Sequence, residues 1–257
     1  MPRWLRYKHN GQTGFGTLEN GTISVFRGDM FASPGPVGET LPLADVHVLT
    51  PCDPTKMICL WNNFHALAKK LDVAPPSTPL FLLKAPNAFI GEGATIHRPK
   101  SYDGPVVYEG ELGIVIGKRC SDVAESDIAD HIFGYTCIND VTAAKIISEE
   151  ATFAQWVRAK SFDAFGPFGP AIATDVEPME LSIRTVLNGD ERQNYPVSDM
   201  FFSPHKLTSL ISRDMTLMPG DVIACGTSVG VGSMKEPENT VSVAIEGIGT
   251  LTNTFVQ

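Results

Sequence analysis

Two glutamates separated by a single residue lie in the strand-like stretch YEGELGIVIGK at 108–118. Side chains of an extended strand alternate between its faces, so Glu109 and Glu111 are expected on one face, opposite the aliphatic residues at 112, 114 and 116. Neighbouring carboxylates repel each other, and burial strengthens the repulsion, which a divalent cation would relieve. Oxygen ligands favour a hard ion such as Mg²⁺, Mn²⁺ or Ca²⁺ over zinc. A solvent-exposed strand edge that binds nothing explains the same spacing.

Asp140, Lys160 and His65 are further candidates for chemistry, each with a structural alternative. Asp140 follows an apolar run and precedes a helix-like segment, so it supplies a third metal ligand or a helix cap, and its two oxygens allow both. Lys160 precedes a loop rich in glycine, proline and aromatic residues. A lysine there can anchor a carboxylate, form a Schiff base or simply lie at the surface. His65 stands where a strand-like run meets a helix-like one, as both site residues and surface histidines do.

The elements that must position these residues are short and mostly strands. With 23 glycines and 19 prolines the chain is rich in turns, which favours many strands over a helical bundle. Strand-like runs lie at 56–61, 79–86, 104–118, 134–140 and in three stretches after residue 179, and helix-like runs lie at 62–72, 125–133 and 141–156. We therefore expect a mainly β (α+β) fold with short helices in its crossovers.

The first fifty residues have the pattern of a small β unit. The stretch 14–27 carries Asn20-Gly21 between two alternating runs, which is a strong hairpin signal. A loop rich in glycine and proline is expected at 33–42, and Thr50-Pro51 marks a boundary. The predicted domains are a small N-terminal β subdomain at 1–50 and a larger catalytic domain at 51–257.

The composition excludes several classes of protein. The chain has 257 residues and a formal net charge of −9, which argues against a nucleic-acid partner. No apolar run approaches the roughly 18 residues of a membrane span, and the first residues lack the apolar core of a signal peptide. Five cysteines without CxxC spacing suit a reducing compartment, so we expect a cytoplasmic protein. The expected partner is a small molecule. No P-loop and no GxSxG motif occurs, whereas GTSVGVG at 226–232 has the character of an anion-binding turn.

Five stretches, taken together, resemble the fumarylacetoacetate hydrolase superfamily and follow one another in the family's order. They are YEGELGIVIGK (108–118), FGYTCINDVTA (133–143), WVRAKSFDAFGPFGP (156–170), NGDERQNYPVSDMFF (188–202) and LMPGDVIACGTSVGVG (217–232). The resemblance extends over about residues 56–255. It implies a mixed β-sandwich roll of the fumarylacetoacetase C-terminal type with a small N-terminal subdomain, and it implies a homodimer.

The resemblance also implies a site in which a divalent ion and a substrate meet. A lysine near both the metal and the substrate matches Lys160, which is expected to be catalytic. The family's metal ligands match Glu109, Glu111 and Asp140, expected to hold Mg²⁺, Mn²⁺ or Ca²⁺. The family's substrate-contacting positions match Gln193, Thr227 and Gly226.

The segment that activates water in hydrolytic members is altered in this chain. Those members carry Asn-Tyr and then His-Ala-x-Glu, where the histidine and the glutamate form a dyad. When His65-Ala66 is matched to His-Ala, the glutamate position holds Ala68. When Asn63-Phe64 is matched to Asn-Tyr without a gap, the two dyad positions hold Leu67 and Lys70. In either case His65 lacks the glutamate, which makes it a weaker general base.

These features predict a metal-dependent enzyme acting on a 2-oxo or enol dicarboxylic acid through a metal-stabilised enolate. One reaction is hydrolysis of a C–C bond in an acylpyruvate-type diketo acid, with His65 activating water. The alternative is isomerisation, tautomerisation or decarboxylation of a 2-hydroxyhepta-2,4-diene-1,7-dioate-like or oxaloacetate-like acid in aromatic catabolism, which needs no such water. A catalytically silent oxo-acid binder is a third hypothesis. Ala144 and Ser228 replace an arginine and a proline of the family pattern, which bears on the identity of the substrate.

Overall fold

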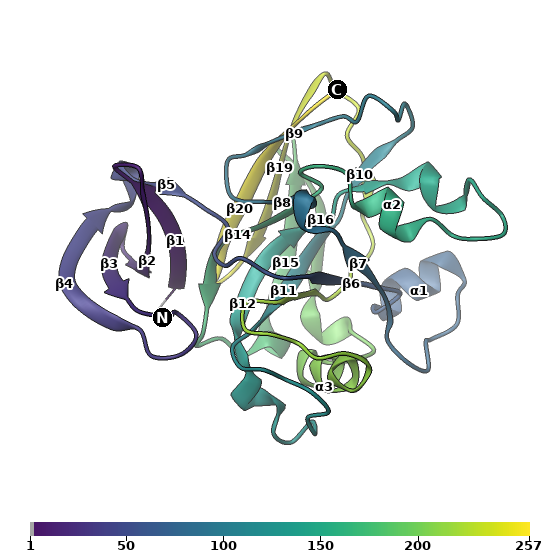
Figure 1. Ribbon diagram of the computed structural model, residues 1–257. Helices are drawn as coiled ribbons and strands as arrows, with labels where there is room; N and C mark the ends of the chain where they lie inside the picture. The colour runs from purple at the N-terminus through teal and green to yellow at the C-terminus, as the bar shows by residue number, and fades with distance from the viewer. Residues whose placement is uncertain (1–2) are drawn as a thin grey trace.

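Strands form most of the regular elements of the computed structural model, which describes residues 3–257 (Figure 1). The largest sheet has 12 strands and extends from the N-terminal unit into the centre of the molecule. Along its path the strands are β4 (Gly35–Pro42), β3 (Thr22–Arg27), β2 (Gln12–Glu19), β1 (Arg3–His9), β14 (Gly166–Ala173), β12 (Ile132–Asn139), β11 (Gly110–Ile116), β17 (Val222–Ala224), β6 (Met57–Trp61) and β7 (Leu80–Lys84). Two short strands lie beside this path, β5 (His47–Val48) next to β1 and β8 (Phe89–Ile90) next to β14.

A second sheet packs across the centre of the first and completes a β-sandwich. Its five strands are β16 (Asp190–Pro196), β15 (Ser182–Leu187), β19 (Glu238–Ile245), β20 (Gly249–Val256) and β9 (Thr95–His97). Strand β11 contacts both β15 and β19, and aliphatic side chains from all three share one buried cluster. A third, small sheet has the order β13 (Thr142–Ala143), β10 (Val106–Tyr108) and β18 (Gly232–Ser233). The predicted mainly β roll is confirmed.

Helices are few and short, as the sequence predicts. The α-helices are α1 (His65–Leu71), α2 (Trp156–Lys160) and α3 (Pro204–Asp214), and six 3₁₀ helices lie at Leu43–Asp45, Pro86–Ala88, Ile128–His131, Ala144–Ser148, Pro178–Glu180 and Val197–Asp199. Helix α3 was not expected, although Ser203 caps it by accepting a hydrogen bond from the Lys206 N–H at 3.3 Å, and a proline follows the cap. Within residues 3–257, no helix has both the length and the apolar character that a membrane crossing requires.

The N-terminal strands form the curved unit at the left of Figure 1 and continue the large sheet through the pairing of β1 with β14. The hairpin at Asn20-Gly21 is confirmed, with φ of 48° and 77° at its two central residues. The loop expected at 33–42 is wrong, because residues 35–42 form strand β4. Strand β4 ends the path of the sheet, and an edge strand tolerates prolines that a central strand would not.

The helix expected at 141–156 is also wrong. Thr142 and Ala143 pair instead with Val107 and Val106 in the small sheet, and only a 3₁₀ turn follows before α2 begins at Trp156. Because no helix begins directly after Asp140, its role as a helix cap is excluded as well. The expected helix at 125–133 is reduced to the 3₁₀ turn Ile128–His131.

Candidate metal and catalytic site

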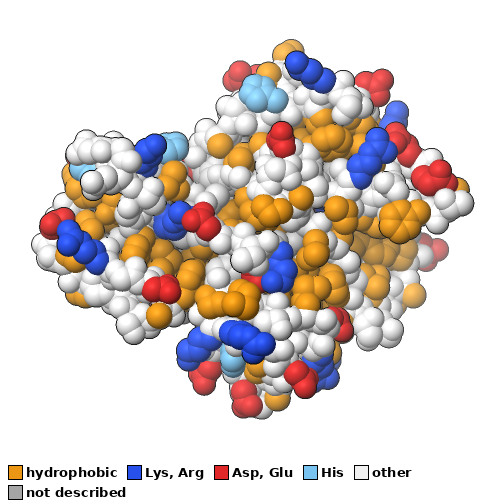
Figure 2. All heavy atoms as spheres, in the orientation of Figure 1, with side chains coloured by type: hydrophobic (Ala, Val, Ile, Leu, Met, Phe, Trp, Pro, Cys, Tyr) orange, Lys and Arg blue, Asp and Glu red, His pale blue; other side chains and the backbone are white. Residues whose placement is uncertain are grey.

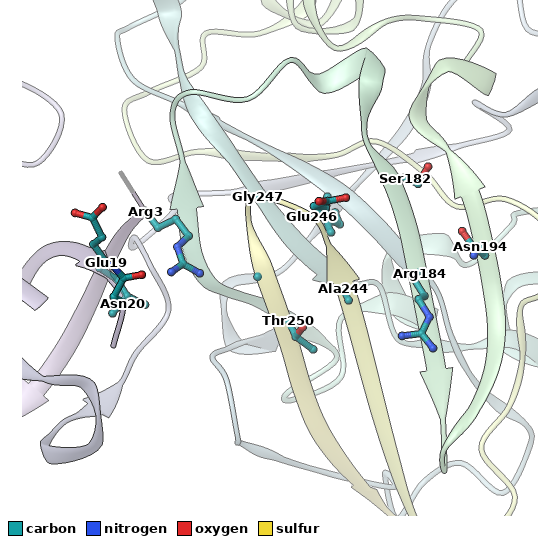
Figure 3. A pocket seen from close by; sticks show the side chains of 13 residues that line it. Arg3, Glu19, Asn20, Ser182, Arg184, Asn194, Ala244, Glu246, Gly247 and Thr250 are labelled. Carbon is teal, nitrogen blue, oxygen red and sulfur yellow. The ribbon is translucent and has the colours of Figure 1, made fainter. Parts of the chain in front are cut away.

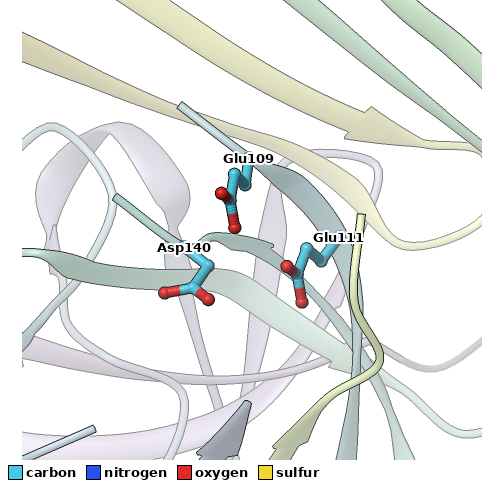
Figure 4. Close-up of side chains that lie close together, drawn as sticks. All are labelled: Glu109, Glu111 and Asp140. Atoms are coloured by element: carbon cyan, nitrogen blue, oxygen red, sulfur yellow. The ribbon is translucent and has the colours of Figure 1, made fainter. Parts of the chain in front are cut away.

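The register between β11 and β12 brings three carboxylates together. Gly110 lies opposite Asn139, so the start of β11 meets the end of β12, and the Asp140 N–H donates to the Glu109 carbonyl at 2.8 Å. Glu109, Glu111 and Asp140 each present an oxygen within 4.8 Å of the others, and Figure 4 shows all three pointing into one space. The side chains of Glu111 and Asp140 are fully buried, and that of Glu109 is 18% exposed. The structure thus assembles the acidic triad that the sequence suggested.

Lys160, at the end of α2, contacts two of these carboxylates. Its Nζ donates to Glu109 Oε2 at 2.7 Å, to Asp140 Oδ2 at 2.6 Å and to Thr142 Oγ1 at 2.8 Å. Burial by itself would lower the pKa of Lys160, but the charges of Asp140, Glu109 and Glu111 outweigh it and raise that pKa above its ordinary value. The ammonium therefore stays protonated beside the triad, which leaves little free amine for a Schiff base.

A second lysine, which the sequence did not single out, approaches the triad from the other side of Asp140. Lys84 Nζ lies 2.6 Å from Asp140 Oδ1, and neither side chain is exposed. The same ammonium donates to the Phe165 carbonyl at 2.6 Å and to the Val141 carbonyl at 3.2 Å. A lysine at the end of the otherwise apolar stretch PLFLL was the available signal, because a buried lysine is rare without a partner. When all three carboxyl groups are ionised, the two ammonium groups leave the site one net negative charge.

Glu111 has the donor chemistry expected of a metal ligand. Its Oε2 accepts a hydrogen bond from the Gly226 N–H at 2.8 Å, whereas its buried Oε1 has no hydrogen-bond donor among residues 3–257. Burial, with the nearby charges of Asp140 and Glu109, raises the pKa of Glu111 well above its ordinary value. A buried carboxylate oxygen without a donor is unfavourable unless a cation approaches it. The triad, which is all oxygen, therefore fits a hard divalent ion.

Gln193, Thr227 and Gly226, the predicted substrate-contacting residues, lie against the same strand. Gln193 Oε1 accepts from the Gly110 N–H at 3.0 Å, and its Nε2 donates to Thr227 Oγ1 at 2.9 Å. Thr227 in turn donates to the Gly110 carbonyl at 3.0 Å, a carbonyl that also accepts from the Tyr195 hydroxyl. Their polar groups thus attach the 226–228 loop to the residue between the two glutamates. Direct contact with a substrate stays a prediction.

His65 lies apart from this network. It is the first residue of α1, it is exposed, and its ring centroid lies 4.0 Å from that of Phe201. Across residues 3–257, no hydrogen bond or ion pair connects His65 to the triad or to a carboxylate. Ala68 is buried and Lys70 is exposed, so neither alignment supplies an acidic partner on this helix. A role for His65 as a general base stays a prediction.

A large surface groove is separate from the triad. It has a volume of about 680 Å³ and lies between the β2–β3 turn and the turn that joins β19 to β20. Figure 3 shows Arg3, Glu19, Arg184 and Glu246 among the residues that line it. Since none of its lining residues belongs to the acidic triad, we assign the chemistry to the triad and not to this groove.

Two family profiles together match nearly all of the residues that the structure describes. Residues 56–256 match the family profile described as fumarylacetoacetate (FAA) hydrolase C-terminal, and residues 3–51 match the one described as Rv2993c-like, N-terminal. Oxaloacetate tautomerase YisK of Bacillus subtilis is 34% identical over 219 residues, which are 81% of this chain and 72% of that protein.

Two solved structures have the same fold over nearly their full lengths. The 2-hydroxyhepta-2,4-diene-1,7-dioate isomerase of Mycobacterium marinum is 38% identical with a TM-score of 0.90, covering 100% of this chain and 98% of that one. The maleylpyruvate hydrolase of Sphingobium sp. SYK-6, in complex with manganese(II) and pyruvate, is 26% identical with a TM-score of 0.79, covering 99% of each chain. Enzymes of several activities therefore share this architecture.

Proposed function

Because this chain belongs to the fumarylacetoacetate hydrolase family, we propose that it is a divalent-metal-dependent enzyme that converts a 2-oxo acid through its enolate. The observation that carries the proposal is the buried cluster of Glu109, Glu111 and Asp140 with the Lys160 ammonium against it. The relatives are, by their names, a tautomerase, an isomerase and a hydrolase, so the residues around the cluster must select the reaction.

The three carboxylates would hold Mg²⁺ or Mn²⁺, and the unpaired Glu111 Oε1 is the oxygen that most needs it. When bound, such an ion supplies a Lewis acid that withdraws charge from the carboxylate and the 2-oxo oxygen of a substrate. The relative solved with manganese(II) and pyruvate supports this choice of ion and of substrate head group. The Gly226 N–H holds the other oxygen of Glu111 and so fixes the orientation of that carboxylate.

Lys160 would serve as the positive group that faces the substrate. Its three hydrogen bonds, to Glu109, Asp140 and Thr142, fix the ammonium at the rim of the cluster. The positive charge there can attract a substrate carboxylate and stabilise the negative charge that develops when a proton leaves C3. Lys84 is held beneath Asp140 by two carbonyls and offsets part of the negative charge of the triad without facing outward.

Among the reactions that share an enolate, we propose isomerisation or tautomerisation for this chain. Both move a proton within the substrate and require no activated water. This choice agrees with the exposed position of His65 and with the lack of an acidic partner for it on α1. An isomerase and an oxaloacetate tautomerase among the relatives support it.

Hydrolysis of a C–C bond in an acylpyruvate-type diketo acid is the second candidate. It is favoured by the likeness to a maleylpyruvate hydrolase over 99% of the chain. This reaction would need a water-activating group from the substrate side of the site, with His65 as the nearest sequence candidate. Decarboxylation of an oxaloacetate-like acid passes through the same enolate and is tested together with the other two.

The test is an ultraviolet time course with Mg²⁺ on oxaloacetate and, separately, on acetylpyruvate, with products identified by NMR. We expect EDTA-sensitive loss of the enol absorbance of oxaloacetate with all its carbons retained, and no conversion by Glu111→Gln. Metal-dependent release of pyruvate and acetate from acetylpyruvate would establish the second candidate. If no 2-oxo acid is converted in a metal-dependent manner, the proposed function is wrong.

A further inference from the structure

We propose that the part of the substrate distal to its 2-oxo acid head is apolar, and that Trp61 and Trp156 form the wall that receives it. The proposal deepens the proposed function and rests on it, because the acidic triad must hold the head. It departs from the dicarboxylate that the sequence led us to expect. Two elements supply this wall: β6 with its partner β7, and α2.

Strands β6 and β7 present one row of side chains toward the triad. The cross-strand partners are Met57 and Lys84, Cys59 and Leu82, and Trp61 and Leu80. Directly opposed residues of an antiparallel pair project from the same face, and the partners in this row are two residues apart along each strand. Lys84 lies on this face and reaches Asp140, so Trp61 and Leu80 project from the face that the triad occupies, at the outer end of the row.

The second element, α2, places another tryptophan beside the same cluster. Trp156 precedes Lys160 by four residues, which is about one helical turn, so both side chains lie on one face of α2. Lys160 contacts Glu109 and Asp140. The ring centroids of Trp156 and Trp61 are 5.7 Å apart, and both side chains are half-buried. The aromatic pair therefore joins the ends of β6 and α2 next to the charged site.

The residues that follow Trp61 are also connected to the triad by hydrogen bonds. Asn63, two residues after Trp61, donates from Nδ2 to the Cys225 carbonyl at 2.9 Å. Gly226, which follows Cys225 in the chain, donates its N–H to Glu111. The segment that follows β6 therefore packs directly on the loop that orients a triad carboxylate.

Polarity changes along this row, from charged groups at the triad to apolar groups at the surface. Leu82 is 8% exposed and Leu80 is 40% exposed, so the apolar surface opens outward. Figure 2 shows hydrophobic side chains on the right-hand side of the molecule, near α2, as well as across its centre. Neither leucine nor tryptophan carries a positive charge, and the ammonium groups of Lys84 and Lys160 are already paired with the triad.

A second carboxylate of the substrate would therefore lose water at this row without gaining a cation, whereas an alkyl or aryl group would gain from burial. The chemical class that fits is a 2-oxo acid with an apolar, preferably aromatic, substituent beyond C3.

Three stable ligands that share one oxalyl head test the proposal on the Mn²⁺-loaded protein by calorimetry. Oxamate is the head alone, oxanilate adds a phenyl ring, and N-oxalylglycine adds a carboxylate. We expect oxanilate to bind about tenfold or more tightly than oxamate, as burial of an aromatic ring implies, and N-oxalylglycine to bind no more tightly than oxamate. Oxanilate should also quench the tryptophan fluorescence, and oxamate should do so less.

Variants assign the effect to the two tryptophans. Trp61→Ala and Trp156→Ala should each remove most of the oxanilate advantage and leave the oxamate Kd unchanged, and Trp156→Phe should restore part of it. Trp4→Phe is the matched control, because Trp4 packs in the N-terminal unit against Phe26, with ring centroids 4.8 Å apart. Its substitution should leave the Kd of both oxanilate and oxamate unchanged. Circular dichroism verifies that each variant is folded.

Two results would overturn the proposal while the proposed function stands. The first is tighter binding of N-oxalylglycine than of oxanilate, and the second is an unchanged oxanilate advantage in both alanine variants. Failure of oxamate to bind in a metal-dependent manner, or full oxamate affinity in Glu111→Gln, would instead contradict the proposed function and this proposal with it.

Discussion

Lys84 and Asp140 form an ion pair in the interior of the molecule, with 2.6 Å between Nζ and Oδ1 and no exposed surface on either side chain. Lys84 ends β7, the last strand on the path of the large sheet, whereas Asp140 follows β12, which lies near the middle of that path. Their pairing connects the edge of the 12-stranded sheet to the acidic triad at its centre.

Removing Lys84 should destabilise the protein. In Lys84→Met, Asp140 keeps only the Lys160 ammonium, and the carbonyls of Val141 and Phe165 lose a buried donor. We expect the free energy of unfolding to fall by about 3 kcal/mol, as measured by urea denaturation. The control is Arg184→Ala, which removes an exposed ion pair and should change stability little. Equal stability of the two variants would mean that the buried pair is not structural.

Replacing one triad carboxylate by its amide should remove metal binding and leave the fold. Glu111→Gln keeps an oxygen for the Gly226 N–H but loses the charge that an ion needs. We expect Mn²⁺ affinity, measured by calorimetry, to fall about 100-fold or more. Glu92→Gln is the matched control, because the carboxylate of Glu92 also accepts a backbone N–H, from Thr252, but lies outside the triad. Similar affinity of both variants would exclude Glu111 as a ligand.

Metal affinity should depend steeply on pH. Burial raises the pKa of Glu111, and the charges of Asp140 and Glu109 raise it further, so this carboxyl group tends to hold a proton in the metal-free protein. Metal binding must then displace the proton, and affinity should fall as pH falls, by about tenfold per pH unit for each proton released. Calorimetry of Mn²⁺ between about pH 5.5 and about pH 7.5, in buffers of different ionisation enthalpy, measures both quantities. A flat profile would mean that the triad is ionised before the metal binds.

His65 and Lys160 should respond very differently to substitution. His65 is exposed and packs on Phe201, so we expect His65→Ala to lower turnover of oxaloacetate enol by less than about tenfold. Lys160→Met should abolish measurable turnover, because it removes the ammonium from the triad. A loss of about 10²-fold or more in His65→Ala would identify a general base and favour the hydrolytic candidate.

Local pattern was sufficient to find the core of the site. Glu109 directly precedes β11 and Glu111 lies within it, and their one-residue spacing brings both carboxylates into the triad. Leu112 packs in the buried cluster with the aliphatic residues that follow it. Strand periodicity is a property of the backbone, so it holds wherever the strand lies in the fold. The hairpin at Asn20-Gly21 was predictable for the same reason, because two adjacent residues with positive φ suffice to define it.

The partners of those residues depended on long-range pairing. The run 141–156 has helix-forming residues, yet Thr142 pairs with Val107 in a sheet and the Val141 carbonyl accepts from Lys84. Helical propensity is worth only tenths of a kcal/mol per residue, so such tertiary contacts override it. Gln193 likewise has a sequence motif that suggests a ligand contact, whereas its amide is engaged by Gly110 and Thr227.

The sequence by itself therefore determined the chemical character of the site: two alternating carboxylates, a third at the end of a strand, and a lysine in a recognisable motif. The tertiary structure decided which charges neutralise them and what surrounds them. Lys84 reaches Asp140, and Trp61 meets Trp156, only because sheet registers and the position of α2 bring distant segments together. No local period encodes a register between strands far apart in the chain, since it is selected by the packing of the whole core.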